Sequence, residues 1–547
     1  MPHRCLKMKK NKPQLTVALL CLLSALFLSL PWLAEGLGVF ALVGFVPLLM
    51  ADRIADREGI KKFWLYYFGA FLIWNAITTF WVGLATVGGA IFAIVANAFQ
   101  MSLVWALFRL GKRYLPGVAP YIFLMAAWLA FERQYFAAEI SWPWLTLGHA
   151  FAQSTSLIQW YEYTGTLGGS LWIWLSNLGI FAAINVFSQK SWMRWTMTAR
   201  WCFLLALVLV LIAPPICSRS ILNRYQCRSE GSVDVIIAQP NFDPYEKFQS
   251  LRQSEQTAVL LSLYEAEFQK DSASNALLLA PETFTGDIVL NSIDASPTVH
   301  SIRRFLKAHP GSEMLLGAST YTYYDQRSAP SLLARQIGDR YVTSHNSAMI
   351  LDADDGAEVY HKSKLVVGTE LTPYPRIFVP LDDWLSKKLG YAGLMGRCEG
   401  QEEVSLLHFG EVPLGAAVCY ESVYGEHCAE YVNKGAQALV VITNDAWWGN
   451  TPGYRQHLSY SCLRAIELRR DIARCGNTGI SCFINQKGEI VSETDWWVRT
   501  SLRGHINLNQ EMTFFAVNGD IVGRISTLVF LLFAALCIAR ALGLGRR

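Results

Sequence analysis

Three side chains that can carry out acyl chemistry stand at the ends of short apolar runs. They are Glu282, Lys362 and Cys419. The runs are 276–280, 357–360 and 414–418. An apolar run of this length bounded by polar residues is typical of a buried strand, which presents the residue at its tip to a substrate. The sequence therefore predicts a carboxylate, an ammonium and a thiol that arrive on three separate strands.

A thiol attacks as the thiolate and is weakly ionised at neutral pH, so it needs a neighbouring base or positive charge. We assign Glu282 as the general base, with a pKa raised by burial so that it can cycle. Lys362 is expected to face the oxyanion of the tetrahedral intermediate, together with the backbone N–H of Tyr420. Lys364 is two residues further on and is expected to point to the other face of the strand.

The order Glu, Lys, Cys on strand ends resembles the nitrilase superfamily, whose members make and break acyl-thioester intermediates with these three residues. One branch, the apolipoprotein N-acyltransferases, is similar in finer detail. The matching segments are 281–282, 360–366 with Glu370 following, 418–421, 443–449 and 456–480. The resemblance covers roughly residues 232–508, and apolar segments on both sides match the layout of that branch.

The resemblance assigns further residues to the site. Glu370 and Glu421 correspond to additional acidic positions: Glu370 is expected to anchor the loop that carries Lys362, and Glu421 to orient Lys362 or Tyr420. The chain has 367–369 as Val-Gly-Thr where the family usually has Pro-Phe-Gly, so this loop departs from the pattern. Apart from the resemblance, the aromatic composition of 366–400 suits a segment that dips into the membrane interface, and the expected lipid contacts are Trp384, Tyr391, Trp447 and Trp448. An ordinary packed excursion of the αββα domain is the alternative.

The composition changes along the chain and indicates separate membrane and water-facing parts. It has 547 residues, of which 52% are hydrophobic and 16% charged, which is too apolar for a wholly soluble protein. We predict an α+β protein with membrane helices: an N-terminal membrane domain over 1–217, a nitrilase-like αββα sandwich over 218–519, and a C-terminal membrane helix and tail over 520–547. About eight spans are expected. They lie near 14–31, 36–51, 62–81, 86–109, 119–137, 166–187, 201–217 and 520–541.

Lys and Arg gather in alternate links between these spans, which predicts that both termini are cytoplasmic and that 218–519 lies outside, in the periplasm of a diderm bacterium. The net charge of +4 follows from this topology and gives no reason to expect nucleic acid. Residues 1–35 also have the form of a cleaved signal peptide, which leaves the large domain outside as well.

Other features are interpreted as structural. The cysteines at 217, 227, 398, 428, 462, 475 and 482 have no C-x-x-C or zinc-ligand spacing, so no metal or cofactor is expected, and one or two disulfides are possible. Glu132, Arg133, Glu139 and His149 are expected at a solvated membrane interface. An interfacial aromatic belt is predicted from Trp142, Trp144, Trp160, Trp172 and Trp174.

The resemblance implies a ping-pong reaction in which Cys419 takes an acyl chain from a phospholipid and passes it to the α-amino group of a diacylglyceryl-cysteine at a lipoprotein N-terminus. A monomer is expected. Two alternatives stay open: a membrane-tethered amidase in which water resolves the thioester, and a non-catalytic membrane receptor that keeps the fold for binding.

Overall fold

The structure, a computed structural model, describes residues 2–188, 191–271, 275–325, 328–390, 393 and 395–543. The chain divides into two compact units. The first comprises Met1–Ala138, Trp142–Tyr225 and Asp520–Arg547, and the second comprises Glu139–Ser141 and Gln226–Gly519. Each unit is described separately below.

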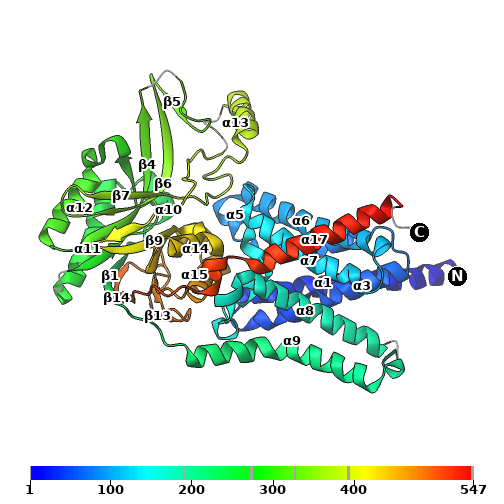
Figure 1. The fold of residues 1–547 in the computed structure, drawn as a ribbon. Helices are drawn as coiled ribbons and strands as arrows, with labels where there is room; N and C mark the ends of the chain where they lie inside the picture. Colours follow the sequence, from blue (N-terminus) through cyan, green and yellow to red (C-terminus); the bar gives the residue numbers. More distant parts are fainter. Residues whose placement is uncertain are drawn as a thin grey trace. The chain divides into compact units, whose positions relative to one another are not determined.

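The first unit is a bundle of apolar helices (Figure 1). Its α-helices are Pro2–Leu33 (α1), Ala41–Gly44 (α2), Val46–Arg57 (α3), Trp64–Thr79 (α4), Val82–Ala85 (α5), Val87–Tyr114 (α6), Ala119–Ala137 (α7), Tyr161–Ser188 (α8), Met197–Arg224 (α9) and Ile521–Ala541 (α17), with short 3-10 turns between α1 and α2 and between α7 and α9. Among the described residues, six helical segments are long and apolar enough to cross a membrane. They are 12–33, 37–57, 87–114, 161–188, 197–224 and 521–541.

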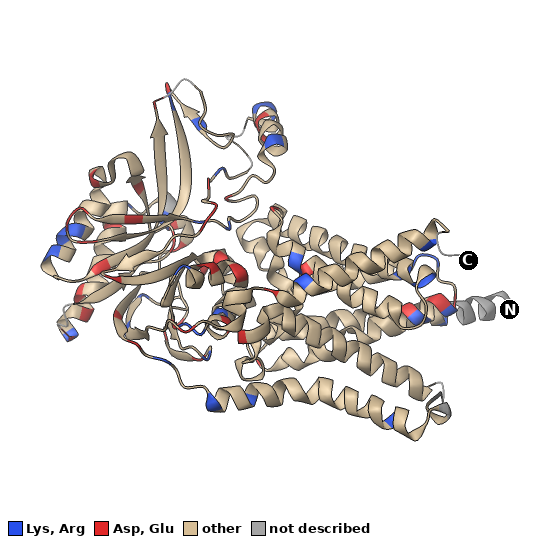
Figure 2. Cartoon of the chain, in the orientation of Figure 1, with Lys and Arg blue, Asp and Glu red and all other residues tan. Residues whose placement is uncertain are grey.

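Two of the eight expected spans therefore do not meet that standard. Helix α4 has 16 residues, fewer than the ~20 that a bilayer requires. Helix α7 has 19 residues and contains Glu132 and Arg133. Both segments are helical as expected, so the count of spans is approximate while their positions agree. Figure 2 shows long stretches of the unit's helices without charged residues.

The predicted aromatic belt is wrong for three of its five tryptophans. Trp144, Trp172 and Trp174 are buried inside the unit. The ring of Trp174 stacks on Phe45 at a centroid distance of 4.4 Å, and Trp128 contacts the same ring edge-on at 5.0 Å. Aromatic pairs contribute about 0.5–1.5 kcal/mol beyond their buried area, so packing between helices places these rings in the interior.

The expected solvation of Glu132 is also wrong, because this side chain is only 3% exposed. Its Oε1 accepts hydrogen bonds from the backbone N–H of Leu147 at 2.8 Å and from Trp128 Nε1 at 3.1 Å. A buried carboxylate needs such donors. Glu132 thus holds the segment after α7 against the helix, and His149 in that segment is buried as well.

Basic residues of separate links meet at one end of this bundle. Arg109 and Lys112 at the end of α6 pair with Asp52 and Asp56 at the end of α3. The C-terminal part of α17 reaches the same place, since Arg540 Nη1 donates to the carbonyl of the last residue of α6 at 2.5 Å. The second link, the fourth link and the C-terminal tail therefore share one side of the unit, as their alternation predicts.

The second unit contains two sheets. The first has the order β14-β1-β2-β4-β6-β5, with β3 pairing with β4 and β7 with β6; the second has the order β13-β12-β11-β10-β9-β8. The strands of the first are Ser232–Gln239 (β1), Ala276–Leu279 (β2), Thr285–Val289 (β3), Glu313–Tyr324 (β4), Arg335–Ile337 (β5), Arg340–Leu351 (β6), Ala357–His361 (β7) and Thr500–Asn507 (β14). Those of the second are Leu407–Phe409 (β8), Val412–Val418 (β9), Ala438–Thr443 (β10), Ile472–Gly476 (β11), Cys482–Ile484 (β12) and Ile490–Glu493 (β13).

Alternate residues along a strand face the two opposite sides of its sheet, and each side packs against a different layer of the unit. In β1, Val233 and Val235 face the second sheet and join one buried core, whereas Ile236 faces the helices and joins another. The helices of this unit are Pro244–Gln249 (α10), Gln253–Lys270 (α11), Pro297–Ala308 (α12), Pro375–Leu389 (α13), Gly425–Asn433 (α14), Pro452–Leu468 (α15) and Phe514–Asn518 (α16). Figure 1 shows α11 and α12 on the outer side of the first sheet and α14 and α15 on that of the second. This arrangement is the predicted αββα sandwich.

Candidate active site

The three predicted strand ends converge in the second unit. Glu282 follows β2, Lys362 follows β7 and Cys419 follows β9. Lys362 Nζ lies 3.1 Å from Glu282 Oε1. Both side chains are buried, Glu282 being 6% exposed and Lys362 1%. Asn346 Nδ2 also donates to Glu282 Oε1 at 2.8 Å, and the backbone N–H of Asn444 donates to Oε2 at 3.1 Å.

Glu370 completes the surroundings of Lys362. Its carboxylate lies 3.0 Å from Lys362 Nζ and accepts Asn346 Nδ2 at 2.6 Å and the backbone N–H of Val366 at 2.7 Å. Burial alone would lower the pKa of Lys362, but the carboxylates of Glu282 and Glu370 raise it well above its ordinary value. Lys362 is therefore a fixed cation and suits charge stabilisation better than proton transfer.

Cys419 occupies a strained turn. Its φ is 54°, in the left-handed region that non-glycine residues disfavour, and such conformations often mark functional residues. Burial raises the pKa of the Cys419 thiol well above its ordinary value, and Glu282 raises it further, while Lys362 acts in the opposite direction. The thiol is therefore protonated at neutral pH and needs a base to take its proton as it attacks.

Glu421 joins the Cys419 turn to the Lys362 turn. Its Oε1 accepts Tyr360 Oη at 2.6 Å and the backbone N–H groups of Ser363 and Lys364 at 2.7 and 3.1 Å, while Oε2 accepts the backbone N–H of Val418 at 2.8 Å. Burial would raise the pKa of Glu421, but His427 and these hydrogen bonds lower it below its ordinary value. The carboxylate holds the backbone of the Lys362 turn, and its duty in the reaction stays a prediction.

The side chains of Lys362 and Lys364 point to different surroundings, but strand alternation, which was the predicted reason, is not the cause. Strand β7 ends at His361, so neither lysine lies within it. The Lys364 ammonium lies 5.7 Å from the centroid of the Tyr424 ring, whereas Lys362 faces the two carboxylates. The turn after β7 separates the two side chains.

A pair behind Cys419 was not predicted to act in the site. His457 on α15 has Nε2 3.0 Å from the carbonyl oxygen of Cys419 and Nδ1 2.9 Å from Asp445 Oδ1. Arg474 Nη2 donates to Asp445 Oδ2 at 2.5 Å. In the sequence, His457 lies within a segment that matches the family only as a motif, and Arg474 inside β11 gives no signal because its partners are distant along the chain.

Ligand-type atoms of Cys419, Asp445 and His457 lie within 4.8 Å of one another. However, both Asp445 oxygens already face partners in Thr443, His457 and the Arg474 guanidinium. The Arg474 guanidinium thus already supplies the positive charge beside the Asp445 carboxylate. Asp445 and His457 are therefore better explained as a hydrogen-bonded support for the Cys419 turn than as metal ligands.

The predicted substrate-binding residues lie in different parts of the second unit. The Trp448 ring contacts His457 at 5.5 Å and is thus beside the Cys419 turn, while the Trp447 ring contacts Tyr245 at 5.6 Å. Trp384 lies on α13 and is 56% exposed, with Lys388 Nζ 5.0 Å from its ring centroid. Tyr391 lies outside the described residues.

The segment around Tyr420 is held by residues from the link after α7. Tyr420 Oη donates to the carbonyl of Ser141 at 3.2 Å, and Ser141 Oγ lies 2.8 Å from Tyr424 Oη. Glu139 in the same link is an exposed residue, and its carboxylate accepts the backbone N–H of Tyr374 at 2.6 Å. The role of the Tyr420 N–H as an oxyanion donor stays a prediction.

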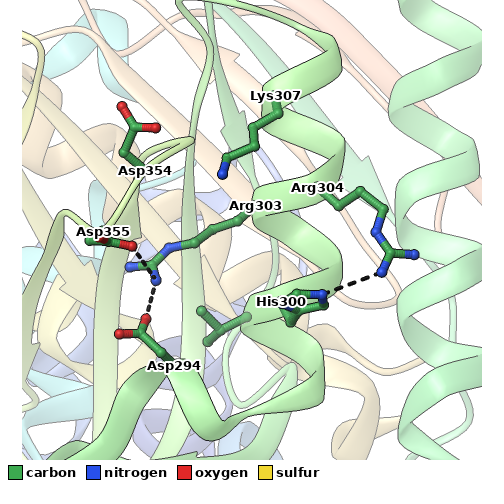
Figure 3. A pocket seen from close by; sticks show the side chains of 8 residues that line it. Asp294, His300, Arg303, Arg304, Lys307, Asp354 and Asp355 are labelled. Atoms are coloured by element: carbon green, nitrogen blue, oxygen red, sulfur yellow. Dashed lines mark hydrogen bonds and ion pairs between the residues drawn. The ribbon is translucent and has the colours of Figure 1, made fainter.

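A separate cavity of about 360 Å³ lies along α12 (Figure 3). Arg303 within it pairs with Asp294 and Asp355, so much of its charge is compensated. Its lining is Asp294, Val299, His300, Arg303, Arg304, Lys307, Asp354 and Asp355. This lining includes none of the predicted site residues.

The seven cysteines considered for disulfides are unpaired in the structure. Cys428, Cys462, Cys475 and Cys482 are buried, in keeping with small apolar side chains of the core.

Two family sequence models match the chain. The apolipoprotein N-acyltransferase N-terminal domain matches residues 24–179, and carbon-nitrogen hydrolase matches residues 324–512. The apolipoprotein N-acyltransferase of Chlorobaculum tepidum is 27% identical over 92% of this chain and 93% of its own length, and that of Geobacter metallireducens is 26% identical over 96% and 93%. The chain belongs to the apolipoprotein N-acyltransferase family.

Solved structures with similarity to part of the chain come from yeast and from bacteria. Nit3 of Saccharomyces cerevisiae, a member of branch 10 of the nitrilase superfamily, has a TM-score of 0.37 at 12% identity over 51% of this chain and 91% of its own. A carbon-nitrogen hydrolase from Helicobacter pylori has a TM-score of 0.35 at 13% identity over 58% of this chain and 99% of its own.

As a family member with several apolar helices, the chain is an integral membrane protein.

Proposed function

We propose that the chain transfers an acyl chain from a membrane phospholipid, through a thioester on Cys419, to the α-amino group of the N-terminal diacylglyceryl-cysteine of apolipoproteins. The names of the relatives along nearly the whole chain support an N-acyltransferase. The observation that carries the chemistry is the buried pair of Glu282 and Lys362 beside Cys419. A thiol of raised pKa next to a carboxylate and a fixed ammonium is suited to acyl transfer.

In the first step, the Glu282 carboxylate takes the proton from Cys419 as Sγ attacks the ester carbonyl carbon of the phospholipid. The carbonyl oxygen becomes an oxyanion that the Lys362 ammonium and the Tyr420 N–H stabilise, each such donor being worth about 10²–10³ in rate. The C–O bond then breaks, and Glu282 returns the proton to the departing oxygen. A lysophospholipid leaves, and the acyl chain remains on sulfur.

In the second step, the acceptor's neutral α-amino group attacks the thioester carbonyl, and Glu282 takes a proton from the amine as the C–N bond forms. The C–S bond breaks, and the thiolate of Cys419 recovers its proton from Glu282. The products are an amide and the free enzyme. Every proton and bond in the two steps is accounted for by Glu282, Lys362, Cys419 and the two substrates, so the proposed scheme uses no cofactor.

The membrane unit supports a proposal for the location. We place the protein in the bacterial inner membrane with 218–519 in the periplasm, since the basic links that share one end of the bundle would face the cytoplasm. The chain would act as a monomer. Helix α13 supports lipid contact, because its exposed residues include Ile377, Leu381 and Trp384. With Tyr391, Trp447 and Trp448 it would guide the acyl chain.

The amidase alternative replaces the acceptor amine by water. This membrane-tethered amidase is less well supported, because the relatives along nearly the whole chain are named N-acyltransferases and the N-terminal domain of that family matches residues 24–179. A receptor without catalysis would have no use for the buried charges around Cys419.

One experiment separates these functions. The purified full-length protein is incubated with phospholipid and a diacylglyceryl lipopeptide, and the products are weighed by mass spectrometry. N-acyl lipopeptide, with a hydroxylamine-labile acyl adduct on Cys419 when the lipopeptide is omitted, is the expected result. Free fatty acid without N-acyl lipopeptide would establish the amidase, and no adduct and no product would refute the catalytic proposal.

A further inference from the structure

A second buried lysine lies beside the turn that carries Glu282. Lys247 belongs to α10, a short helix whose first N–H groups are capped by Asp243. The side chain is 5% exposed, and its Nζ donates to the carbonyl oxygen of Thr283 at 2.6 Å. A buried ammonium requires hydrogen-bonded or charged partners, and the Thr283 carbonyl is one of them.

The carbonyl that Lys247 holds belongs to a strained residue. Thr283 has a φ of 48°, a left-handed conformation that is especially unfavourable for a β-branched side chain. The other side of the turn is fixed by β4, where the N–H of Gly317 donates to Pro281 at 3.2 Å. A Cβ on Gly317 would come within 2.5 Å of Glu282 Cα, so the strand and the turn are in close contact. The Glu282 backbone is therefore held between β4 and the Lys247 ammonium.

We propose that Lys247 is a positioning residue for the acyl transfer: its ammonium fixes the turn that aims Glu282. The proposal rests on the function proposed above. The first cation, Lys362, is shared with Glu370, so it does not neutralise Glu282 alone. The Lys247 ammonium brings a second positive charge to the surroundings of Glu282.

The charges around Lys247 and Glu282 are consistent with a positioning role for Lys247. Burial lowers the pKa of Lys247 to about 8, and the Glu282 carboxylate opposes this by raising it. Glu282 in turn faces Lys362 and lies within electrostatic reach of the Cys419 thiol, and Glu370 faces Lys362 from the other side. Lys247 is thus positively charged through neutral pH and acts on the base of the site.

Three substitutions separate position from charge. Lys247→Arg keeps both the charge and a donor for the Thr283 carbonyl. Lys247→Gln keeps a donor but removes the charge, and Lys247→Met removes both. Lys307→Met is the matched control, because Lys307 is an exposed lysine of the same unit that lines the α12 cavity (Figure 3).

The measurement is the rate of acyl-adduct formation on Cys419 against pH, at subsaturating dioleoyl phosphatidylethanolamine in detergent micelles, by mass spectrometry of the full-length protein. The acid limb of this profile reports the base of the free enzyme. Lys247→Gln and Lys247→Met remove a positive charge from the surroundings of the base, so the acid limb of both should move up by about one pH unit. On that limb their rates should fall about tenfold below wild type.

Lys247→Met should also lose rate on the plateau, because the Thr283 carbonyl loses its donor, whereas Lys247→Arg and Lys307→Met should keep the wild-type acid limb. Equal rate losses in all three Lys247 variants with an unmoved acid limb would show mere structural support and overturn the proposal. Unchanged profiles would overturn it too. A wild-type protein that forms no adduct would instead refute the proposed function, which keeps the two failures distinct.

Discussion

Replacing Glu421 by Gln should disconnect the two turns that carry Lys362 and Cys419 while hardly changing the shape of the side chain. The carboxylate accepts one hydroxyl and three backbone N–H groups and also lies 3.3 Å from His427 Nε2. In the Gln variant, one amide oxygen can serve the three donors at the Oε1 position. The amide NH₂ would then face the N–H of Val418, leaving that donor without an acceptor.

The cost can be worked from these contacts. Hydrogen bonds to a charged acceptor are worth about 1 kcal/mol more than those to a neutral one, which gives about 3 kcal/mol for the three retained donors. The unpaired Val418 N–H adds about 2 kcal/mol. Relief from burying the Glu421 charge offsets part of this sum, so a net loss of about 3–5 kcal/mol is expected. The melting temperature should fall by about 10 °C.

Activity should fall further than stability alone explains. A misplacement of about 1 Å can cost about 10²-fold in rate, and freeing the Lys362 turn permits such a shift. The assay is adduct formation on Cys419 by mass spectrometry at a temperature well below the melting point, with melting followed in parallel. Glu430→Gln, at an exposed position on α14, serves as the control. A Glu421→Gln protein with wild-type adduct rate and a melting temperature within about 2 °C would refute this reasoning.

Three further outcomes are expected. Cys419→Ala should fold but acquire no hydroxylamine-labile acyl group, and Cys419→Ser should turn over much more slowly; an acylated alanine variant would move the nucleophile elsewhere. Lys362→Ala should lose at least about 10²-fold in adduct formation while Lys364→Ala keeps most of it, since only Lys362 faces Glu282; the reverse ranking would overturn the assignment. Burial, aided by His345, lowers the pKa of His361 from 6.5 to about 4. The unfolded chain therefore binds more protons between these values, and about 2–3 kcal/mol of stability should be lost as the pH falls from 6.5 to 4. His361→Asn should flatten that slope in thermal melts across this range, and an unchanged slope would count against it.

Much of the site could be predicted because its chemistry is local in sequence. Each of the three reactive residues follows a short apolar run, and the structure places β2, β7 and β9 at those runs. The periodicity of a buried strand shows in its own residues, so the strand ends and the αββα class could be predicted from the sequence. The same holds for the apolar helices, whose positions agree although two fall short of a full span.

The errors arose where burial depends on partners far away in the chain. Trp174 was expected at an interface because tryptophan is common there, yet it packs on Phe45 from another helix. Glu132 was expected in solvent because it is charged, yet it accepts the backbone N–H of Leu147. In both cases the side chain's own character predicts exposure, and only the neighbouring helices reverse it.

Local patterns along the chain are enough to indicate which residues can do the chemistry and in which order they follow their strands: Glu282, Lys362 and Cys419, in a chain with apolar helices on both sides. Tertiary structure alone decided how their charges balance. The two carboxylates that share Lys362, the hold of Glu421 on both turns, and the buried ammonium of Lys247 join segments separated by tens of residues. Hydrogen bonds and ion pairs act over a few ångströms, so they depend on proximity in space, which no local pattern encodes.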